Sequence, residues 1–470
     1  MSISKSFLVC ASIVALYGCA VGPDYVAPVT DVPAWQGDGD EMSAPEPFWL
    51  ASEYADEYAA LAGLVEQALD GNKDIAIAQA RIAESRAQLT AARGARLPAL
   101  ALDTRYTAFE QSIRSPQSAG PLIEAGVIPR TGEFYNASLQ ASWEIDIFGL
   151  RAREIEAGLA AMLATEAEAE AIALQVVAET ISAWSDWQSF SQRVEVAERN
   201  IALQSKTLEI ISGKVRLGLA RRLDEVRAES ALAELQSRLP GLQAATVGAA
   251  QRLAVLLGTD AGALALSPQR VTPPKDLAIG TKADMLRRRP DLRIAERSLA
   301  AATAQQGAAT AAMFPQLTLT AAGGFEAGGV DDLFSGDARN SGIVPFVRWP
   351  IFQGRRLRAA KAAADARQQQ ALASYEKAVL QAFADAEAAI AGQRAANGAL
   401  GAVVKAAASA AEAESLASKL YQQGLTDYLS LLDAQRQLAL LEDAEIESRN
   451  QAVQAAARLY KSLGGSWQPN

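Results

Sequence analysis

The stretch Phe134 to Phe148, FYNASLQASWEIDIF, alternates apolar and polar residues with a period of two. Successive side chains of a β-strand point to opposite faces, so this pattern predicts a strand with one apolar and one polar face. A strand of a soluble sandwich can alternate in the same way. Two features instead favour a transmembrane β-strand between lipid and a lumen: a length near the roughly 9–11 residues that cross a bilayer, and small or acidic polar positions.

The composition argues against several classes of function. The 470 residues contain no histidine and only two cysteines, Cys10 and Cys19. Triads built on histidine and metal sites built on His or Cys are therefore not expected, and we predict no metal and no cofactor. A net charge of −10 argues against a nucleic-acid partner. An enzyme with a pair of catalytic carboxylates is not excluded by composition, but it is the weakest of the alternatives.

The amino terminus has the pattern of an export signal that ends at a cysteine. Lys5 precedes a short apolar run, Phe7 to Leu16, which is followed by Tyr17-Gly18-Cys19. We predict a signal peptide at 1–18 and, because the segment resembles a lipoprotein cleavage site, a lipid anchor on Cys19. An ordinary signal peptide is the alternative. Residues 19–50 are rich in Pro, Gly and Asp, which predicts an extended, lipid-anchored tether.

The two halves of the chain repeat one another. Asn72 to Leu102 aligns without a gap on Arg289 to Leu319 at an offset of 217 residues, and residues 215–235 align on 421–441 at an offset of 206. We interpret this as a duplication. The predicted divisions are a first repeat at 51–260, a linker at 261–288, a second repeat at 289–464 and a tail at 465–470.

Each half is expected to contain a helix, two strands, a long helix, a turn and a return helix. The long helices lack proline over more than sixty residues, and their sparse large apolar residues are typical of antiparallel coiled coils. Pro240-Gly241 predicts a kink or break in the first return helix. The expected strands cover about 99–110, 134–148, 316–326 and 343–352, the long helices 150–216 and 355–421, and the return helices 220–257 and 427–463.

Several motifs occur in a familiar order: LYGC followed by AVGPDYVAP, IFGLRARE, RRRPDLRIAE, and GLTDYLSLLDAQRQLALLE. With the duplicated unit, they make the chain resemble the TolC-like outer-membrane efflux proteins, in particular the lipoprotein branch that serves resistance-nodulation-division (RND) pumps. The resemblance implies an α+β membrane protein that is a homotrimer. Four transmembrane β-strands per chain would complete a trimeric 12-stranded β-barrel, and the helices would form a long periplasmic α-helical barrel of antiparallel coiled coils.

The implied function is passive conduction and not catalysis. The chain would be the exit duct of a tripartite efflux system in the bacterial outer membrane, working with a periplasmic adaptor protein and an inner-membrane RND-type pump. It lacks the GxxxxGK[ST] signature of a nucleotide-driven motor. Two alternatives remain: the outer-membrane component of a type I secretion system, and a periplasm-spanning structural or adaptor coiled coil, against which the lipid-facing strands argue.

The resemblance also implies site residues. The segment LLDAQR matches the one whose acidic and basic residues narrow the periplasmic entrance in related channels. The first half departs from this pattern but repeats the charge spacing nearer the turn, which suggests a secondary gate. A surface ion pair and purely structural glycine turns are the alternatives. The candidates are Tyr421, Asp433 and Arg436 for the gate, Asp224 and Arg227 for the secondary gate, and Leu217, Gly218, Leu219, Gly424 and Leu425 for adaptor docking.

Overall fold

The computed structural model describes residues 20–28, 47–52, 54–114, 120–275, 277 and 279–465. The predicted signal peptide, Cys19, most of the predicted tether and residues 466–470 lie outside this part of the chain. The chain forms two compact units. Unit 1 comprises Met1–Pro28, Ala83–Ala164 and Glu296–Ser374, and unit 2 comprises Val29–Ile82, Thr165–Ala295 and Tyr375–Asn470.

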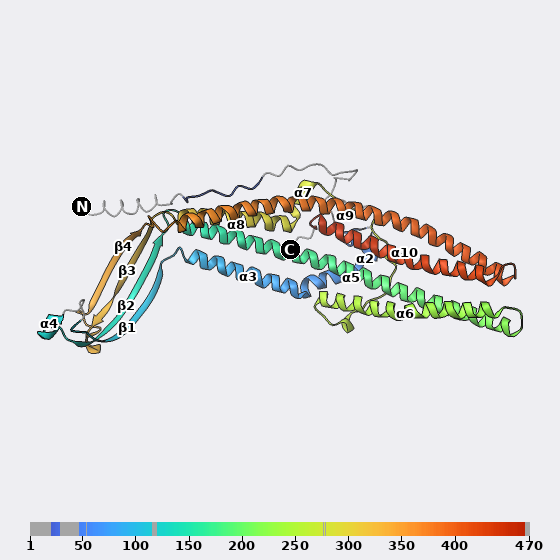
Figure 1. Cartoon of the computed structure of the whole chain (residues 1–470), viewed down its shortest axis with the longest axis horizontal. Helices are drawn as coiled ribbons and strands as arrows, with labels where there is room; N and C mark the ends of the chain where they lie inside the picture. The colour runs from blue at the N-terminus through green and yellow to red at the C-terminus, as the bar shows by residue number, and fades with distance from the viewer. Residues whose placement is uncertain are drawn as a thin grey trace. The chain divides into compact units, whose positions relative to one another are not determined.

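Unit 1 contains a four-stranded antiparallel sheet in the order β1-β2-β3-β4 (Figure 1). The connection between β1 and β2 includes a short helix, α4 (Gly120–Glu124), and the one between β3 and β4 a single 3-10 turn, η2 (Val330–Asp332). Because the order in the sheet follows the order in the chain, β1 and β4 each have one edge without a partner strand in the described chain. The strands are β1 (Ala99–Glu110), β2 (Thr131–Ile145), β3 (Gln316–Ala327) and β4 (Arg339–Arg348).

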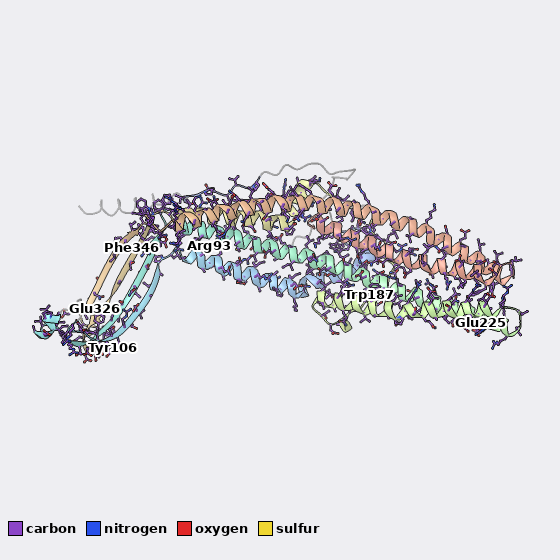
Figure 2. All side chains as sticks on the ribbon, in the orientation of Figure 1. Arg93, Tyr106, Trp187, Glu225, Glu326 and Phe346 are labelled. Carbon is purple, nitrogen blue, oxygen red and sulfur yellow. The ribbon has the colours of Figure 1, made fainter. Side chains whose placement is uncertain are left out.

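The register places most apolar residues of the four strands on one face of the sheet, although Val344 and Phe346 of β4 lie on the other face, opposite Thr320 and Thr318. Leu139 of β2 lies opposite Leu102 of β1, and Trp143 lies opposite Leu319 of β3. The other face carries Asp103, Asn136, Gln140, Thr318, Thr320 and Glu326, in agreement with the alternation in the sequence. In Figure 2, Tyr106 and Glu326 mark one end of the sheet and Phe346 lies toward the other. The exposed apolar side chains include Leu100, Leu102, Tyr106, Leu139, Trp143, Ile343 and Val347.

Two strands end earlier than the sequence pattern predicts. The alternating pattern of β2 continues to Phe148, but the strand ends at Ile145. The side chain of Asp146 accepts a hydrogen bond from the Ala152 amide (2.8 Å), which caps the start of the next helix and ends the strand. The strand expected at 343–352 instead covers Arg339–Arg348. Pro350 has no N–H to donate to a sheet, so the apolar Trp349 and Ile351 lie beyond the strand.

The remaining elements are mainly long helices. No helix in the described part of the chain is both long and apolar enough to cross a membrane. A kink or break was predicted at Pro240; α6 is continuous through it, so the helix does not break there. The buried side chains beyond it, such as Leu253 and Leu257, hold the helix together despite the missing hydrogen bond. The helices are α2 (Ala55–Gly71), α3 (Lys73–Gly94), α5 (Leu150–Arg216), α6 (Arg222–Leu257), α7 (Lys282–Arg288), α8 (Pro290–Ala311), α9 (Arg356–Gln422) and α10 (Tyr428–Ser462).

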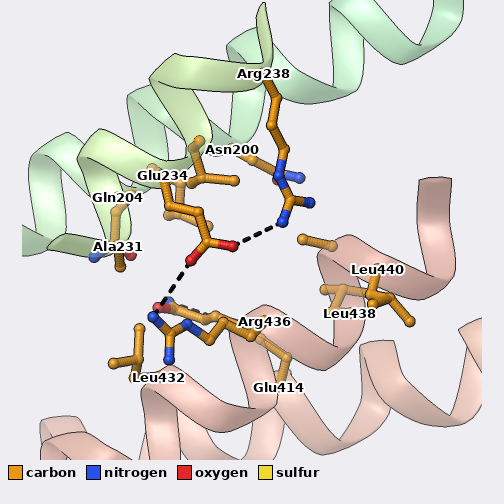
Figure 3. A pocket seen from close by; sticks show the side chains of 14 residues that line it. Asn200, Gln204, Ala231, Glu234, Arg238, Glu414, Leu432, Arg436, Leu438 and Leu440 are labelled. Carbon is orange, nitrogen blue, oxygen red and sulfur yellow. Dashed lines mark hydrogen bonds and ion pairs between the residues drawn. The ribbon is translucent and has the colours of Figure 1, made fainter. Parts of the chain in front are cut away.

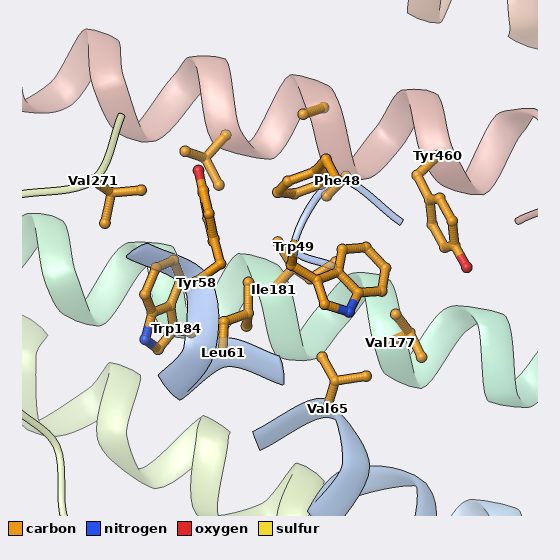
Figure 4. Packing of buried hydrophobic residues seen from close by; sticks show 13 residues of the cluster. Phe48, Trp49, Tyr58, Leu61, Val65, Val177, Ile181, Trp184, Val271 and Tyr460 are labelled. Carbon is orange, nitrogen blue, oxygen red and sulfur yellow. The ribbon is translucent and has the colours of Figure 1, made fainter. Parts of the chain in front are cut away.

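The largest core of unit 2 is aromatic (Figure 4). Trp184 of α5 lies under Tyr58 of α2, and Tyr58 packs edge-to-face against Phe48. Phe48 also packs against Trp49, whose ring contacts Tyr460 of α10. Residues 47–50 were expected to end an extended surface tether. They instead form a turn that inserts Phe48 and Trp49 into the core, where burial of such rings is strongly favourable.

The predicted linker at 261–288 also has regular structure. It contains the 3-10 turn η1 (Ala261–Ala263) and helix α7. The hydroxyl of Thr281 caps α7 by accepting a hydrogen bond from the Asp284 amide (3.1 Å) and donates one to the Asp284 carboxylate (2.7 Å). This is the Thr-x-x-acid pattern of a capping box, so the sequence does carry a signal for α7.

Replacing Asn72 by alanine should destabilise unit 2 by about 1–3 kcal/mol. Its side-chain oxygen caps α3 through the amides of Asp74 (2.8 Å) and Ile75 (3.2 Å), and its Nδ2 donates to the Leu256 carbonyl (2.8 Å). The measurement is heat-induced unfolding followed by circular dichroism. Asn72→Ser keeps a capping oxygen and loses the donor to Leu256, so its loss should be smaller; equal losses would contradict the assigned capping role.

Candidate functional site

The first candidate region is formed by the two helix turns that join α5 to α6 and α9 to α10. In the first turn, the Gly218 amide donates to the Val215 carbonyl (2.9 Å) and the Leu219 amide to that of Lys214 (2.8 Å). The second repeats this pattern, from Gly424 to Tyr421 (3.1 Å) and from Leu425 to Leu420 (2.9 Å). Both are Schellman motifs, in which a residue with positive φ ends the helix. Gly218 (φ 71°) and Gly424 (φ 75°) supply that residue.

The leucines that follow these glycines are exposed. In a Schellman motif the residue after the glycine commonly packs back against the last helical turn. Here Leu219 is 75% exposed and Leu425 is 69% exposed, and Leu217 is 75% exposed as well. The two turns therefore present apolar side chains to their surroundings, which is the property expected of a docking surface and is not needed to end a helix.

The two helix pairs are joined behind the turns by a small core. Ile211 of α5 and Ala228 of α6 are fully buried there, together with Tyr428 and Leu431 of α10. The Nε2 of Gln204 donates to the Tyr428 hydroxyl (3.2 Å) and to the Ala228 carbonyl (3.3 Å). Burial is the main cause that raises the pKa of Tyr428, so its hydroxyl remains protonated at neutral pH.

Tyr421 and the secondary gate candidates lie in one cluster. The ring of Tyr421 lies 6.1 Å from that of Tyr428, and the ammonium of Lys214 lies over it at 4.5 Å. Burial and, to a smaller extent, the charge of Asp224 raise the pKa of the Tyr421 hydroxyl. Asp224 in turn lies 3.9 Å from Arg227. The gate and secondary gate residues were inferred from different halves of the sequence, and the structure brings Tyr421 and Asp224 together.

Arg436 forms an ion pair across the seam between the two halves and not with its neighbour in sequence. Its guanidinium lies 3.5 Å from the carboxylate of Glu234 on α6, and Glu234 is also held by Arg238 at 2.7 Å (Figure 3). In the described part of the chain, no ion pair joins Asp433 to Arg436, and Asp433 is exposed. The exposed ion pair of Arg436 is therefore made with Glu234 and not with Asp433.

Glu234, Lys214 and Gln204 were missed at the level of sequence. At the 206-residue offset Glu234 aligns with Leu440, so comparison of the halves gives no signal for a charge there. Only the spacing of Glu234 and Arg238 at i and i+4 indicates that they are neighbours on one helix face. In Figure 2, Glu225 marks the α5–α6 end of this region.

A second candidate site, in unit 1, holds the segment that follows Cys19. The Val21 amide donates to the Phe148 carbonyl (3.1 Å). The side chain of Arg153, only 4% exposed, donates to Asp24 (2.7 Å) and to the carbonyl of Gly22 (3.2 Å). A buried guanidinium requires such partners, so the segment is tied to the start of α5 by a built contact. Cys19 itself lies outside the described residues.

Neither region has the donors of a metal site. Among the residues that the structure describes, no group of three or more His, Cys, Asp or Glu side chains is arranged to hold a metal ion. The residues of these two regions instead provide ion pairs, hydrogen bonds and exposed apolar surface.

Comparisons with known proteins agree with one another. The family model described as "Outer membrane efflux protein" matches residues 64–259 and 283–465. The outer membrane protein OprJ of Pseudomonas aeruginosa is 33% identical over 98% of this chain and 96% of its own length, and nodulation protein T of Rhizobium leguminosarum bv. trifolii is 30% identical over 95% and 94%. The solved outer-membrane channel OprN superimposes with a TM-score of 0.85 at 31% identity, covering 96% of this chain and all of that one.

Proposed function

The chain belongs to the outer membrane efflux protein family and is an outer-membrane efflux channel, and from this premise we propose that three copies form the exit duct of a tripartite efflux system. In this proposal a periplasmic adaptor binds the helix turns, and an inner-membrane RND-type pump supplies the driving force.

The sheet of unit 1 is the observation that carries the proposal. Its apolar face is exposed along all four strands, with Leu100 and Leu102 about two-thirds exposed or more. Such a face is costly in water and favourable in lipid, at roughly 25 cal/mol per Å² of apolar surface. Four strands cannot close on themselves, because a membrane barrel needs about eight or more. Pairing the free edge of β4 with β1 of the next copy would remove both edges, and three copies would give twelve strands.

The opposite face supports a water-filled lumen. A polar cavity of about 520 Å³ lies over it and is lined by Asp103, Arg105, Asn136, Gln140 and Glu326 among others. Charged and amide side chains are favourable next to water and costly next to lipid. This face suits the passage of hydrated solutes through the assembled sheet.

Native mass spectrometry of the detergent-extracted protein tests the assembly. We expect a complex of three chains. A stable monomer or dimer with a folded sheet would contradict the closure of a twelve-stranded barrel. Complementation tests the function: deleting the gene should raise the retention of exported compounds in cells, and the wild-type chain should restore export.

The lipid anchor gives a separate prediction. Mass spectrometry of the mature amino terminus should find a diacylglyceryl group on Cys19. Cys19→Ser should lower the amount of protein in the outer membrane much more than it lowers conductance per channel, because acyl chains only supplement a sheet already inserted in lipid. Cys10→Ser, within the predicted signal peptide, is the matched control and should change neither quantity. An unmodified start at another residue would contradict the anchor.

A further inference from the structure

A cavity of about 380 Å³ lies at the seam between the α5–α6 pair and the α9–α10 pair in unit 2 (Figure 3). Its walls include five leucines: Leu203 of α5, Leu235 of α6, and Leu432, Leu438 and Leu440 of α10. Leu203 and Leu440 are about half exposed. Sites for small organic molecules commonly have about 300–1,000 Å³, mostly apolar walls and a few polar groups. The cavity has this character, and conduction through the duct does not require it.

Two arginines and two glutamates line the cavity, so the lining as a whole is neutral, but both guanidinium groups meet at one of the two acids. Arg238 and Arg436 both contact Glu234, at 2.7 and 3.5 Å. Two guanidinium groups on one carboxylate leave one net positive charge. Glu414, the other acid of the lining, accepts a hydrogen bond from the Nε2 of Gln435 (3.5 Å).

Both guanidinium groups have donors to spare. A guanidinium carries five N–H donors. The side chains of Arg238 and Arg436 are both more than half exposed, so donors that Glu234 does not use are open to solvent. The 3.5 Å contact of Arg436 is also long for a charge-assisted hydrogen bond, which a carboxylate or sulfonate would make at about 2.7–2.9 Å.

We propose that this cavity binds an amphipathic organic anion, whose apolar body lies on the leucines and whose acid group contacts Arg238 and Arg436. The site is distinct from the helix turns and from the polar face of the sheet, but it shares Arg436 with the candidate gate. It is also assembled from both halves of the chain, so an occupant would contact α6 and α10 at the same time.

The test compares two fluorescent probes, anilinonaphthalene sulfonate and phenylnaphthylamine, which share the same rings and differ in the sulfonate. The oligomer is held in lipid nanodiscs, and nanodiscs without protein give the background. We expect saturable binding of the sulfonate, one molecule per chain, and binding of the neutral probe that is weaker by about tenfold or more.

Substitutions test whether the sulfonate probe binds in this cavity. Ala439→Phe should fill the cavity and abolish saturable binding, and Arg238→Gln should weaken sulfonate binding about tenfold. Arg252→Gln is the matched control: Arg252 also lies on α6, is 59% exposed and pairs with an acid, Asp186, at 2.7 Å, but it does not line the cavity. It should bind as the wild type does. Circular dichroism and the oligomer mass confirm that each variant is folded.

Three results would overturn the proposal: no saturable sulfonate binding above the background, equal affinity for the two probes, or wild-type affinity in folded Ala439→Phe. A cavity filled by a second copy in the oligomer would give the first of these. The assay does not measure conductance, so its failure leaves the proposed function untouched.

Discussion

Replacing both Asp433 and Arg436 by alanine should raise the resting conductance of the channel and make cells more sensitive to large antibiotics. Arg436 ties α10 to α6 through Glu234 at 3.5 Å. One exposed ion pair contributes only about 0.2–1 kcal/mol, but a trimer repeats it three times. The total of about 0.6–3 kcal/mol corresponds to a rise of about 3- to 150-fold in the ratio of open to closed channels. Single-channel recording measures this ratio directly.

A second ion pair of α10, made with α5 and not with α6, provides a control. Arg199 of α5 and Glu442 of α10 lie 3.4 Å apart; Arg199 is about as exposed as Arg436, and Glu442 is less exposed than Glu234. Removing both with alanine should leave the resting conductance unchanged. Glu234→Gln should reproduce part of the increase, because it removes the partner of Arg436 and keeps Asp433. A folded trimer of the Asp433, Arg436 double variant with wild-type conductance would show that these residues do not gate the channel.

Replacing Leu219 and Leu425 by aspartate should abolish cross-linking to the adaptor and stop export. Both side chains are more than two-thirds exposed. Full burial of a leucine stabilises a contact by about 1.5–3 kcal/mol. Each chain of a trimer would present both leucines, which gives six exposed leucine side chains in all. A charge in their place would have to be desolvated on docking. Site-specific cross-linking to the adaptor in intact cells, with efflux measured in parallel, checks both effects.

The control for this variant adds a negative charge to a turn but leaves both leucines in place. Gln423 lies in the α9–α10 turn, is polar and exposed, and can be replaced by aspartate. Gln423→Asp should therefore retain most of the cross-linking. Two outcomes would count against docking at the turns: cross-linking that persists in the double aspartate variant, and loss of the trimer itself, which would make the turns purely structural.

The sequence predicts the sheet well where side-chain alternation alone determines it. The faces of β2 and β3 follow from the period of two, and the paired strands agree with them. The strand ends are less predictable, because they depend on single groups. Asp146 ends β2 by capping α5, and Pro350 lies just beyond β4. The burial of Phe48 and Trp49 was not predictable from a segment rich in Pro and Gly, since it depends on packing with Trp184 and Tyr460, which are distant in sequence.

The candidate site, too, is only partly predictable from the sequence. Comparison of the halves identifies the two turns, and the glycines there have the positive φ that a Schellman motif requires. Comparison cannot identify Glu234, whose counterpart in the other half is Leu440. The contact of Glu234 with Arg436 joins α6 to α10 and therefore depends on how the two helix pairs pack. Such a contact has no local signal in the sequence.

The central claim is that the assembled chain conducts, and recording in planar bilayers tests it most directly. Purified wild-type protein and the Asp433, Arg436 double alanine variant are each added to a bilayer after the trimer has been verified. The account predicts discrete conductance steps for both proteins, with a larger open fraction for the variant. Folded trimers that insert into the bilayer and give no steps in either form would contradict it.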